Sequence, residues 1–492
     1  MSDHDARQAE GAGRQPATVT MFSPLSAILR RPPVTVPLAA TVREALELME
    51  RLRAGALVIA DPATRVPLGI FTLRDLLRRV TLPGGDLGQP IAGVMTSGLI
   101  ALTPQATAHQ AALTMARNGV RHLVVVDEAG RLAGVVSQDD LFALQRVGVL
   151  EVSEEIRAAR DVEGLRAAGL RIRELIDGLL AQGIGTETLT HFISTLNDLL
   201  TMRVIELMAD EYDPPPVPVC WIALGSEGRL EQTFCTDQDN GIIFEADEAD
   251  AEEVRAALLP FARAVNGKLH ACGFQLCPGE IMAGNPRWCL TLREWQRTFA
   301  GWIEEPHPEA LLNASIFFDL RPIHGRETLA ARLRAWLVSA AAEHPRFLRL
   351  MAENALASQP PLGTLRDFVY ARSTDFPHTI DLKAQGTRPF VEAARILALA
   401  GRVPHTSTAE RLRGAAEVGR LDPAALAATV DAFYFVHLLR LRHQCKTHGQ
   451  SEGANRVDPE ELNELDRQVL KQALRQARKL QGRLVSEFRL RG

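Results

Sequence analysis

A pattern that occurs twice near the N-terminus constrains the fold of this chain more than any other feature. Each copy has two short apolar runs separated by a polar turn, at 57–59 and 69–71 in the first copy and at 123–126 and 134–136 in the second. An amphipathic helical segment precedes each copy. A solenoid needs at least about three copies of its unit. The repeat therefore predicts two half-domains, each with a helix and strands, that pack on each other.

Each copy ends with a hydroxyl residue that is followed three positions later by an aspartate, Thr72 with Asp75 and Ser137 with Asp140. This spacing is typical of a capping box, in which the two side chains satisfy backbone N–H groups at the start of a helix. A helix N-terminus also attracts phosphate. Two interpretations are therefore open, a purely structural cap or a nucleotide-binding site, and the two are compatible.

The two copies resemble a tandem pair of CBS domains over residues 22–146. In that family, Gly-x-x-Thr/Ser-x-x-Asp at the end of the second strand is the usual nucleotide signature. The resemblance implies that Thr72 and Ser137 contact a phosphate and that Asp75 and Asp140 hold ribose hydroxyls. It also implies an adenine nucleotide as effector. Because CBS pairs often dimerise, a homodimer is expected.

Composition and charge exclude several classes of protein. The 492-residue chain has 46% hydrophobic residues, which is ordinary for a globular protein of several domains. Its formal net charge of −5 argues against a globally basic nucleic-acid-binding protein. Residues 1–20 are polar and contain no secretory signal. No run of 18 apolar residues indicates a membrane span. We expect a cytoplasmic protein with neither a membrane nor a nucleic acid as partner.

Two polar segments beside apolar strands carry the clearest chemical signal. Gly225 and Ser226 follow the apolar run 219–224, and a glycine there lets the backbone approach a triphosphate closely. Asp237 and Asp239 follow at a spacing that puts both side chains on one face of a strand. Adjacent carboxylates repel each other unless they share a cation. The expected cation is Mg²⁺ (or Mn²⁺), which prefers oxygen ligands and keeps room for the phosphates of an NTP.

A third carboxylate is expected if two metal ions clamp the transferred phosphoryl group. Asp319 is the best candidate, because it stands in the segment 315–325, which we predict to be an apolar strand where an unpaired charge is costly. It would bind the metal that activates the acceptor hydroxyl and would serve as its base. Arg229 and Arg321 would neutralise phosphate charge. Catalysis would then come from positioning and charge neutralisation.

The turn Gly-Ser-Glu-Gly-Arg, the strand Asp-Gln-Asp and the later Asp-Leu-Arg, in this order, resemble the nucleotidyltransferase fold of the DNA polymerase β superfamily. The nearest branch is that of the uridylyltransferase that modifies the PII nitrogen-signal protein. Over almost the whole chain, the resemblance is to bacterial nucleotidyltransferases with CBS domains and a helical C-terminal substrate-binding domain. It implies transfer of NMP from an NTP to a protein or a small molecule. The only His-Asp dipeptide stands at 4–5, so the deuridylylating activity of an HD domain is not expected.

The C-terminal part is predicted to be mostly helical, with a polar loop at 358–390 in which charged side chains gather among Phe and Tyr. The charged residues are Arg366, Arg372, Asp375, His378, Asp381, Lys383 and Arg388. They could bind a polar acceptor or the nucleotide, with Arg372 and Lys383 as candidate contacts. They could equally form a buried ion-pair network.

These features together predict a multidomain α/β plus α protein. We expect a disordered tail at 1–20, a tandem CBS regulatory domain at 21–147, a helical connector at 148–212, a nucleotidyltransferase domain with a polymerase-β-like mixed sheet and helices at 213–330, and a helical substrate-binding domain at 331–492. The predicted function is Mg²⁺-dependent nucleotidyl transfer that an adenine nucleotide regulates through the CBS pair. The alternative is a catalytically inactive module that senses nucleotide and signals through a partner protein.

Overall fold

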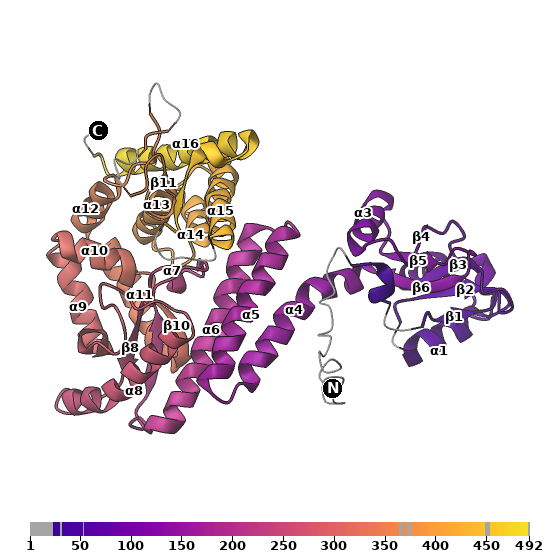
Figure 1. The fold of residues 1–492 in the computed structure, drawn as a ribbon, viewed down its shortest axis with the longest axis horizontal. Helices are drawn as coiled ribbons and strands as arrows, with labels where there is room; N and C mark the ends of the chain where they lie inside the picture. The colour runs from indigo at the N-terminus through magenta and orange to yellow at the C-terminus, as the bar shows by residue number, and fades with distance from the viewer. Residues whose placement is uncertain are drawn as a thin grey trace, which may run out of the picture. The chain divides into compact units, whose positions relative to one another are not determined.

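The computed structural model describes residues 23–29, 32–52, 54–363, 368–370, 375–447 and 453–490 (Figure 1). The tail predicted at 1–20 lies outside these residues. The chain divides into two compact units, Met1–Leu150 and Glu151–Gly492, and helix α4 (Gln138–Ala158) runs through the boundary. The connector, the transferase domain and the C-terminal domain that the sequence predicts therefore belong to one unit.

The first unit contains two copies of one arrangement, in which a parallel and an antiparallel pairing make a three-stranded sheet. The first copy consists of β1 (Thr35–Val36), α1 (Val42–Leu52), β2 (Ala56–Ala60) and β3 (Pro67–Thr72). The second copy consists of β4 (Ala101–Leu102), α3 (Ala108–Asn118), β5 (His122–Val126) and β6 (Leu132–Ser137).

Side chains alternate between the two faces of the central strands, and this alternation explains why the two copies pack on each other. Leu57 and Ile59 of β2 enter the core of the first copy. Val58 points to the opposite face and joins Val124 and Leu132 of the second copy in a shared cluster. Strands that are apolar on both faces are thus buried on both faces. The predicted pair of packed half-domains is confirmed.

The second unit begins with two long helices. Helix α5 (Val162–Ala181) starts at Asp161, whose side chain accepts a hydrogen bond from the Gly164 N–H at 2.8 Å. Helix α6 (Thr186–Tyr212) packs against α8 (Ala251–Ala271), against strand β10 (Arg321–Gly325) and against α15 (Pro423–Lys446) of the C-terminal part. The connector predicted from the sequence therefore packs against the four-stranded sheet that follows it.

The four-stranded sheet of the second unit has the strand order β10-β7-β8-β9. Its strands are β7 (Val219–Ala223), β8 (Asn240–Phe244), β9 (Cys289–Thr291) and β10 (Arg321–Gly325). Strand β7 is antiparallel to β8 and to β10, whereas β8 and β9 are parallel. Helix α9 (Leu292–Glu304) fixes its position on the sheet through Trp295, which is fully buried and donates its indole N–H to the Ile242 carbonyl at 2.9 Å. The predicted mixed sheet is confirmed.

The strand predicted at 315–325 is wrong in its first half. Helix α10 (Pro308–Phe317) occupies that part, and β10 starts only at Arg321. Pro308 is at the first helical position, and the His307 side chain accepts a hydrogen bond from the Ala310 N–H, so the chain has a well-formed helix start there. Asp319 therefore lies in the turn between a helix and a strand.

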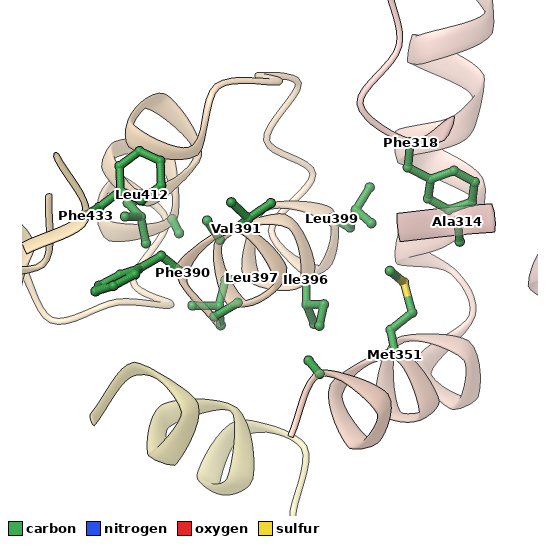
Figure 2. Packing of buried hydrophobic residues seen from close by; sticks show 14 of the residues in the cluster. Ala314, Phe318, Met351, Phe390, Val391, Ile396, Leu397, Leu399, Leu412 and Phe433 are labelled. Carbon is green, nitrogen blue, oxygen red and sulfur yellow. The ribbon is translucent and has the colours of Figure 1, made fainter. Parts of the chain in front are cut away.

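Helices α11 to α16 form the C-terminal part. They are α11 (Glu327–Ala342), α12 (Pro345–Ala355), α13 (Arg388–Ala400), α14 (Thr408–Glu417), α15 (Pro423–Lys446) and α16 (Glu464–Glu487). A short hairpin of β11 (Ile380–Asp381) and β12 (Arg456–Val457) lies beside them. Helix α13 is buried on almost all sides. Figure 2 shows its Phe390 and Leu397 in one core with Phe433 of α15, Phe318 and Met351.

Helix α15 is the one helix among the described residues that is long and apolar enough to cross a membrane. Half of its most apolar window is buried within the unit. It packs against α14 and α16 and carries buried basic residues, which is typical of a core helix.

Candidate functional site

Asp237 and Asp239 lie in the extended segment that leads into β8 rather than inside a strand. Between them, the Gln238 N–H donates to the Gln275 carbonyl at 2.8 Å, and the Gln238 amide donates to the Asn266 and Phe274 carbonyls at 3.0 and 3.1 Å. Neighbouring side chains alternate in an extended segment. The buried amide of Gln238 thus fixes one face of the segment, and this alternation assigns the two aspartates to the other face.

The turn after β7 lies directly against Asp239. The Leu224 N–H donates to the Asp239 carbonyl at 2.8 Å. Gly225 has φ +52, and a Cβ added to it would lie 2.6 Å from Asp239 Oδ2. Ser226 follows in the short helix α7 (Gly225–Gly228), where its carbonyl accepts from the Glu231 N–H at 3.0 Å. The structure therefore brings the predicted turn and the predicted acidic pair together.

The two carboxylates of the acidic pair have different surroundings, and both are partly exposed. Burial raises the pKa of Asp239 to about 6, against the opposing effects of a hydrogen bond from the Cys277 thiol and the charge of Lys383. The Asp237 side chain is 43% exposed, and its Oδ2 lies 3.8 Å from Lys383 Nζ. Lys383 comes from the polar loop that the sequence analysis singled out, so this predicted contact residue is at the acidic pair.

The donor set fits Mg²⁺ or Mn²⁺. Two carboxylates supply hard oxygen ligands, and the exposure of Asp237 leaves room for water and phosphate oxygens, which Mg²⁺ normally keeps in its coordination sphere. Gly225 leaves just the space beside Asp239 Oδ2 that a side chain would fill. Across the described ranges, however, no group of three or more His, Cys, Asp or Glu side chains could hold a metal ion.

The prediction that Asp319 completes a three-carboxylate metal site is wrong in this structure. Its side chain is fully buried, and both oxygens are taken by guanidinium groups. Arg395 donates to both oxygens at 2.9 and 2.6 Å, Arg411 to Oδ1 at 2.5 Å and Arg229 to Oδ2 at 2.6 Å. Despite burial, the charges of Arg395, Arg411 and Arg229 hold the pKa of Asp319 well below its usual range. Asp319 joins the sheet to the C-terminal helices.

The arginines that were predicted to contact phosphate are also engaged in ion pairs. Arg229 lies between Asp319 and Glu231, whose Oε2 is 2.7 Å from Arg229 Nε. Arg321 pairs with Asp198 at 2.8 Å and donates to the Glu227 carbonyl at 3.1 Å. Both side chains hold the turn and the helices around it. Their direct contribution to phosphate binding remains a prediction.

Two further acidic residues lie near the pair and were not predicted. Glu227 stands inside α7 and is 5% exposed, and burial raises its pKa to about 8, with the charges of Asp198 and Asp239 acting in the same direction. Burial also raises the pKa of Asp198, which comes from α6. The place of Glu227 in the middle of the glycine turn was the one signal in the sequence. Asp198 has no local motif.

Arg372 and Arg366 lie outside the described residues, so their predicted roles are open. In the described part of the polar loop, Asp381 caps a turn by accepting from the Lys383 and Ala384 N–H groups at 2.9 and 2.8 Å. Arg388 lies 3.9 Å from Glu392. Lys383 points to Asp237 in the transferase part, which favours the substrate-binding interpretation for this residue.

In the first unit, both predicted capping pairs are present. Asp75 Oδ2 accepts from the Thr72 N–H and hydroxyl at 3.0 and 2.7 Å, and Asp140 Oδ2 accepts from the Ser137 N–H and hydroxyl at 2.8 and 2.6 Å. The two copies contribute different residues to a cavity of about 390 Å³. Thr72, Asp75 and Ser137 line that cavity together with Thr96, whereas Asp140 does not. A volume of several hundred Å³ suits a ligand of nucleotide size.

Known families match three parts of the chain. Residues 25–82 and 91–146 match the CBS domain. Residues 170–309 match the family described as "Putative nucleotidyltransferase DUF294", and residues 345–488 match "Putative nucleotidyltransferase substrate binding domain".

Curated relatives and solved structures resemble part of the chain. It is 33% identical to a CBS domain-containing protein of Bacillus subtilis over 101 residues, which are 20% of this chain and 70% of the relative. It is 33% identical to an arabinose 5-phosphate isomerase of Escherichia coli over 22% of this chain and 33% of the enzyme. The chain thus spans between 33% and 70% of these relatives' lengths.

Among solved structures, a CBS domain protein from Pyrobaculum aerophilum, described as complexed with AMP, is 34% identical over 24% of this chain and 89% of its own, with a TM-score of 0.23. A CBS-domain protein from Agrobacterium tumefaciens is 32% identical over 25% of this chain and 98% of its own, also with a TM-score of 0.23. The chain is therefore a CBS-domain protein that also carries the domain described as "Putative nucleotidyltransferase DUF294" and the domain described as "Putative nucleotidyltransferase substrate binding domain".

Proposed function

We propose that this protein transfers a nucleoside monophosphate from an NTP to a hydroxyl group of a protein or a small molecule, with Mg²⁺ at Asp237 and Asp239. The observation that carries the proposal is the apposition of Gly225 and Asp239, with the exposed Asp237 carboxylate on the same face. A backbone turn without side chains beside a partly exposed acidic pair is the arrangement that a metal-bound triphosphate requires.

In the proposed reaction, the acceptor hydroxyl attacks the α-phosphorus and releases its proton to solvent, a new P–O bond forms, and the bond to the bridging oxygen of the β-phosphate breaks to release pyrophosphate. The metal ion, when bound, supplies charge neutralisation at the phosphate oxygens. Asp237 and Asp239 hold it in place. Lys383, which lies 3.8 Å from Asp237, adds a second positive charge at the open side of the pair. The chain's contribution is positioning and electrostatics.

The nucleotide and the acceptor are tested together. Purified protein is incubated with Mg²⁺, each α-³²P-labelled NTP in turn, UTP first, and clarified cell lysate. The wild type is expected to label a discrete species, whereas Asp237→Asn and Asp239→Asn are not. UTP has priority because the turn and the acidic pair resemble the uridylyltransferase branch. Equal labelling by the wild type and both variants would contradict the proposal.

For the CBS pair, we propose that an adenine nucleotide binds in the cavity beside Thr72, Asp75 and Ser137 and biases transfer. AMP is the first effector to test, because the Pyrobaculum aerophilum protein with 34% sequence identity is described as complexed with it. Regulation requires that AMP binds two states of the protein with different affinities. Transfer rates with and without AMP test this directly.

One observation favours a second function, a module that binds nucleotide without turning it over. The described residues hold two rather than three carboxylates at the site, since Asp319 is bound by arginines. Such a module would bind NTP with Mg²⁺ and move no label to any acceptor. Binding without transfer in the experiment above would therefore select this alternative.

A further inference from the structure

Helix α15 carries two buried basic side chains that have unusually few hydrogen-bond acceptors around them. His437 is 2% exposed and Arg440 is 5% exposed. They are three residues apart, so they lie on the same side of the helix, one above the other. Both ring nitrogens of His437 are without a hydrogen-bond partner in the described structure. A buried imidazole normally has at least one partner, so this pair of unsatisfied nitrogens calls for an explanation.

Arg440 has no carboxylate partner among the described residues. Its Nε and Nη2 both donate to a single neutral acceptor, Asn455 Oδ1, at 3.1 and 3.0 Å. Gln444 donates to the same oxygen at 3.2 Å. Other buried arginines of this unit are treated differently, since Arg395 pairs with both Asp319 and Glu392. Donors therefore outnumber acceptors around Arg440.

The acidic groups that act on Arg440 from a distance have other partners. Asp381 accepts from two backbone N–H groups. Glu231 pairs with Arg229 and accepts from the Thr408 N–H at 2.7 Å. Burial lowers the pKa of Arg440 to about 10, which still leaves the guanidinium charged at neutral pH. A charge that is buried without a counter-ion is costly.

Arg440 is connected to the segment that carries the acidic pair. One turn further along α15, Gln444 accepts from the Phe234 N–H at 3.1 Å, three residues before Asp237. On the other side, the Asn455 carbonyl accepts from the Leu382 N–H at 2.8 Å, and the next residue is Lys383, whose amine lies 3.8 Å from Asp237. Hydrogen bonds thus tie the surroundings of Arg440 to both sides of the acidic pair.

We propose that Arg440 and His437 form a subsite for an anionic oxygen group, a phosphate or a carboxylate, of a molecule bound at the acidic pair. An anion there would supply the missing counter-charge of Arg440 and an acceptor for the imidazole N–H of His437. Two sources are possible, the triphosphate of the NTP or an anionic group on the acceptor. The inference rests on the proposed function for its location, but anion binding itself requires no turnover.

The test compares variants of two arginines on one helix. Arg440→Gln removes the buried charge, Arg440→Lys keeps a positive charge, and Arg442→Gln is the control, because Arg442 is exposed and already paired with Asp466. The probes are sodium tripolyphosphate and Mg²⁺-UTP, and Kd is measured by equilibrium dialysis or calorimetry. If the NTP is the source, Arg440→Gln should weaken both probes by about 10- to 100-fold, Arg440→Lys less, and Arg442→Gln not at all.

If the acceptor is the source, both probes bind Arg440→Gln normally, and the rate of label transfer in lysate falls while the KM for UTP stays constant. The proposal is overturned if Arg440→Gln binds both probes and transfers label as the wild type does. If Arg440→Gln does not fold, two measurements replace it. The first is probe binding and label transfer by Arg440→Lys, and the second is the rise in melting temperature that tripolyphosphate causes in the wild type. The proposal is overturned as well if Arg440→Lys shows normal probe binding and normal label transfer and the melting temperature of the wild type does not rise. If probe binding depends on Arg440 but the protein transfers no label, the proposed function is refuted and the anion subsite is supported.

Discussion

Gly225 lies so close to Asp239 that a Cβ at position 225 would be 2.6 Å from Asp239 Oδ2. The two residues come from different segments, the turn after β7 and the extended lead into β8, which the hydrogen bond from the Leu224 N–H to the Asp239 carbonyl joins. The backbone of the turn therefore positions the Asp239 carboxylate. A site built in this way is sensitive to the smallest side chain that can be added.

Gly225→Ala is expected to weaken Mn²⁺ binding by about tenfold or more, because the new methyl group meets the carboxylate oxygen and the positive φ disfavours alanine. Binding is measured by electron paramagnetic resonance of free Mn²⁺. Gly267→Ala is the control, since Gly267 lies in α8 with no atom near an added Cβ and should gain about 0.5–1 kcal/mol of stability. Unchanged Mn²⁺ affinity in Gly225→Ala would show that Asp239 is not a ligand.

Metal affinity is expected to depend on pH through Asp239. A ligating carboxylate must be deprotonated, and burial raises the pKa of Asp239 to about 6. Mn²⁺ affinity should therefore be constant above that value and fall as the pH drops through about 6. A titration of Mn²⁺ affinity from pH 5 to pH 8 measures the midpoint.

The thiol of Cys277 provides a matched variant for this titration. Its hydrogen bond lowers the pKa of Asp239, so Cys277→Ala should move the midpoint to higher pH. Cys445→Ala, at a thiol on α15 that does not bond Asp239, should leave the midpoint in place. A midpoint that is the same in Cys277→Ala and wild type would remove this contact from the explanation.

The elements that the sequence predicts well are those with a local pattern. The apolar runs at 57–59 and 123–126 are buried on both faces, and the i, i+2 spacing of Asp237 and Asp239 gives a shared face because Gln238 is anchored on the other. Asp319 has no such local signature. A buried acid before an arginine suits a metal ligand and an ion-pair centre equally, and the partners that decide lie 76 to 92 positions away in sequence. Arg440 and His437 likewise have no local signature in the sequence.

Asp319→Asn is expected to lower the free energy of unfolding of the second unit by about 3–5 kcal/mol, because it leaves three buried guanidinium groups without their shared counter-charge. All five tryptophans stand between 221 and 336, so urea denaturation followed by tryptophan fluorescence reports on this unit. Asp237→Asn, at an exposed carboxylate, should change stability little. Loss of Mn²⁺ binding with unchanged stability in Asp319→Asn would instead support the metal-ligand role that the sequence suggested.

The ion pairs of Asp319 predict that the folded second unit loses stability in acid. The folded-state pKa of Asp319 is lower than its unfolded value, so its contribution to stability is complete above the ordinary carboxylate pKa of about 3.9 and is lost as the pH falls below it. Asp319→Asn lacks that contribution at every pH. The stability difference between wild type and Asp319→Asn should therefore shrink between pH 5 and pH 2, and a difference independent of pH would contradict the assignment.

The two capping pairs of the CBS repeats offer an internal comparison. Asp75 and Asp140 make the same bonds to their own helix starts, but only Asp75 lines the 390 Å³ cavity. Asp75→Asn is expected to weaken AMP binding by about tenfold or more, because a carboxylate that accepts ribose hydroxyls is lost, whereas Asp140→Asn should change it by less than about twofold. Calorimetric titration with AMP measures both. Since each variant disturbs an equivalent cap, equal weakening would assign the effect to helix stability, and an unequal one in the expected direction would assign Asp75 to the ligand.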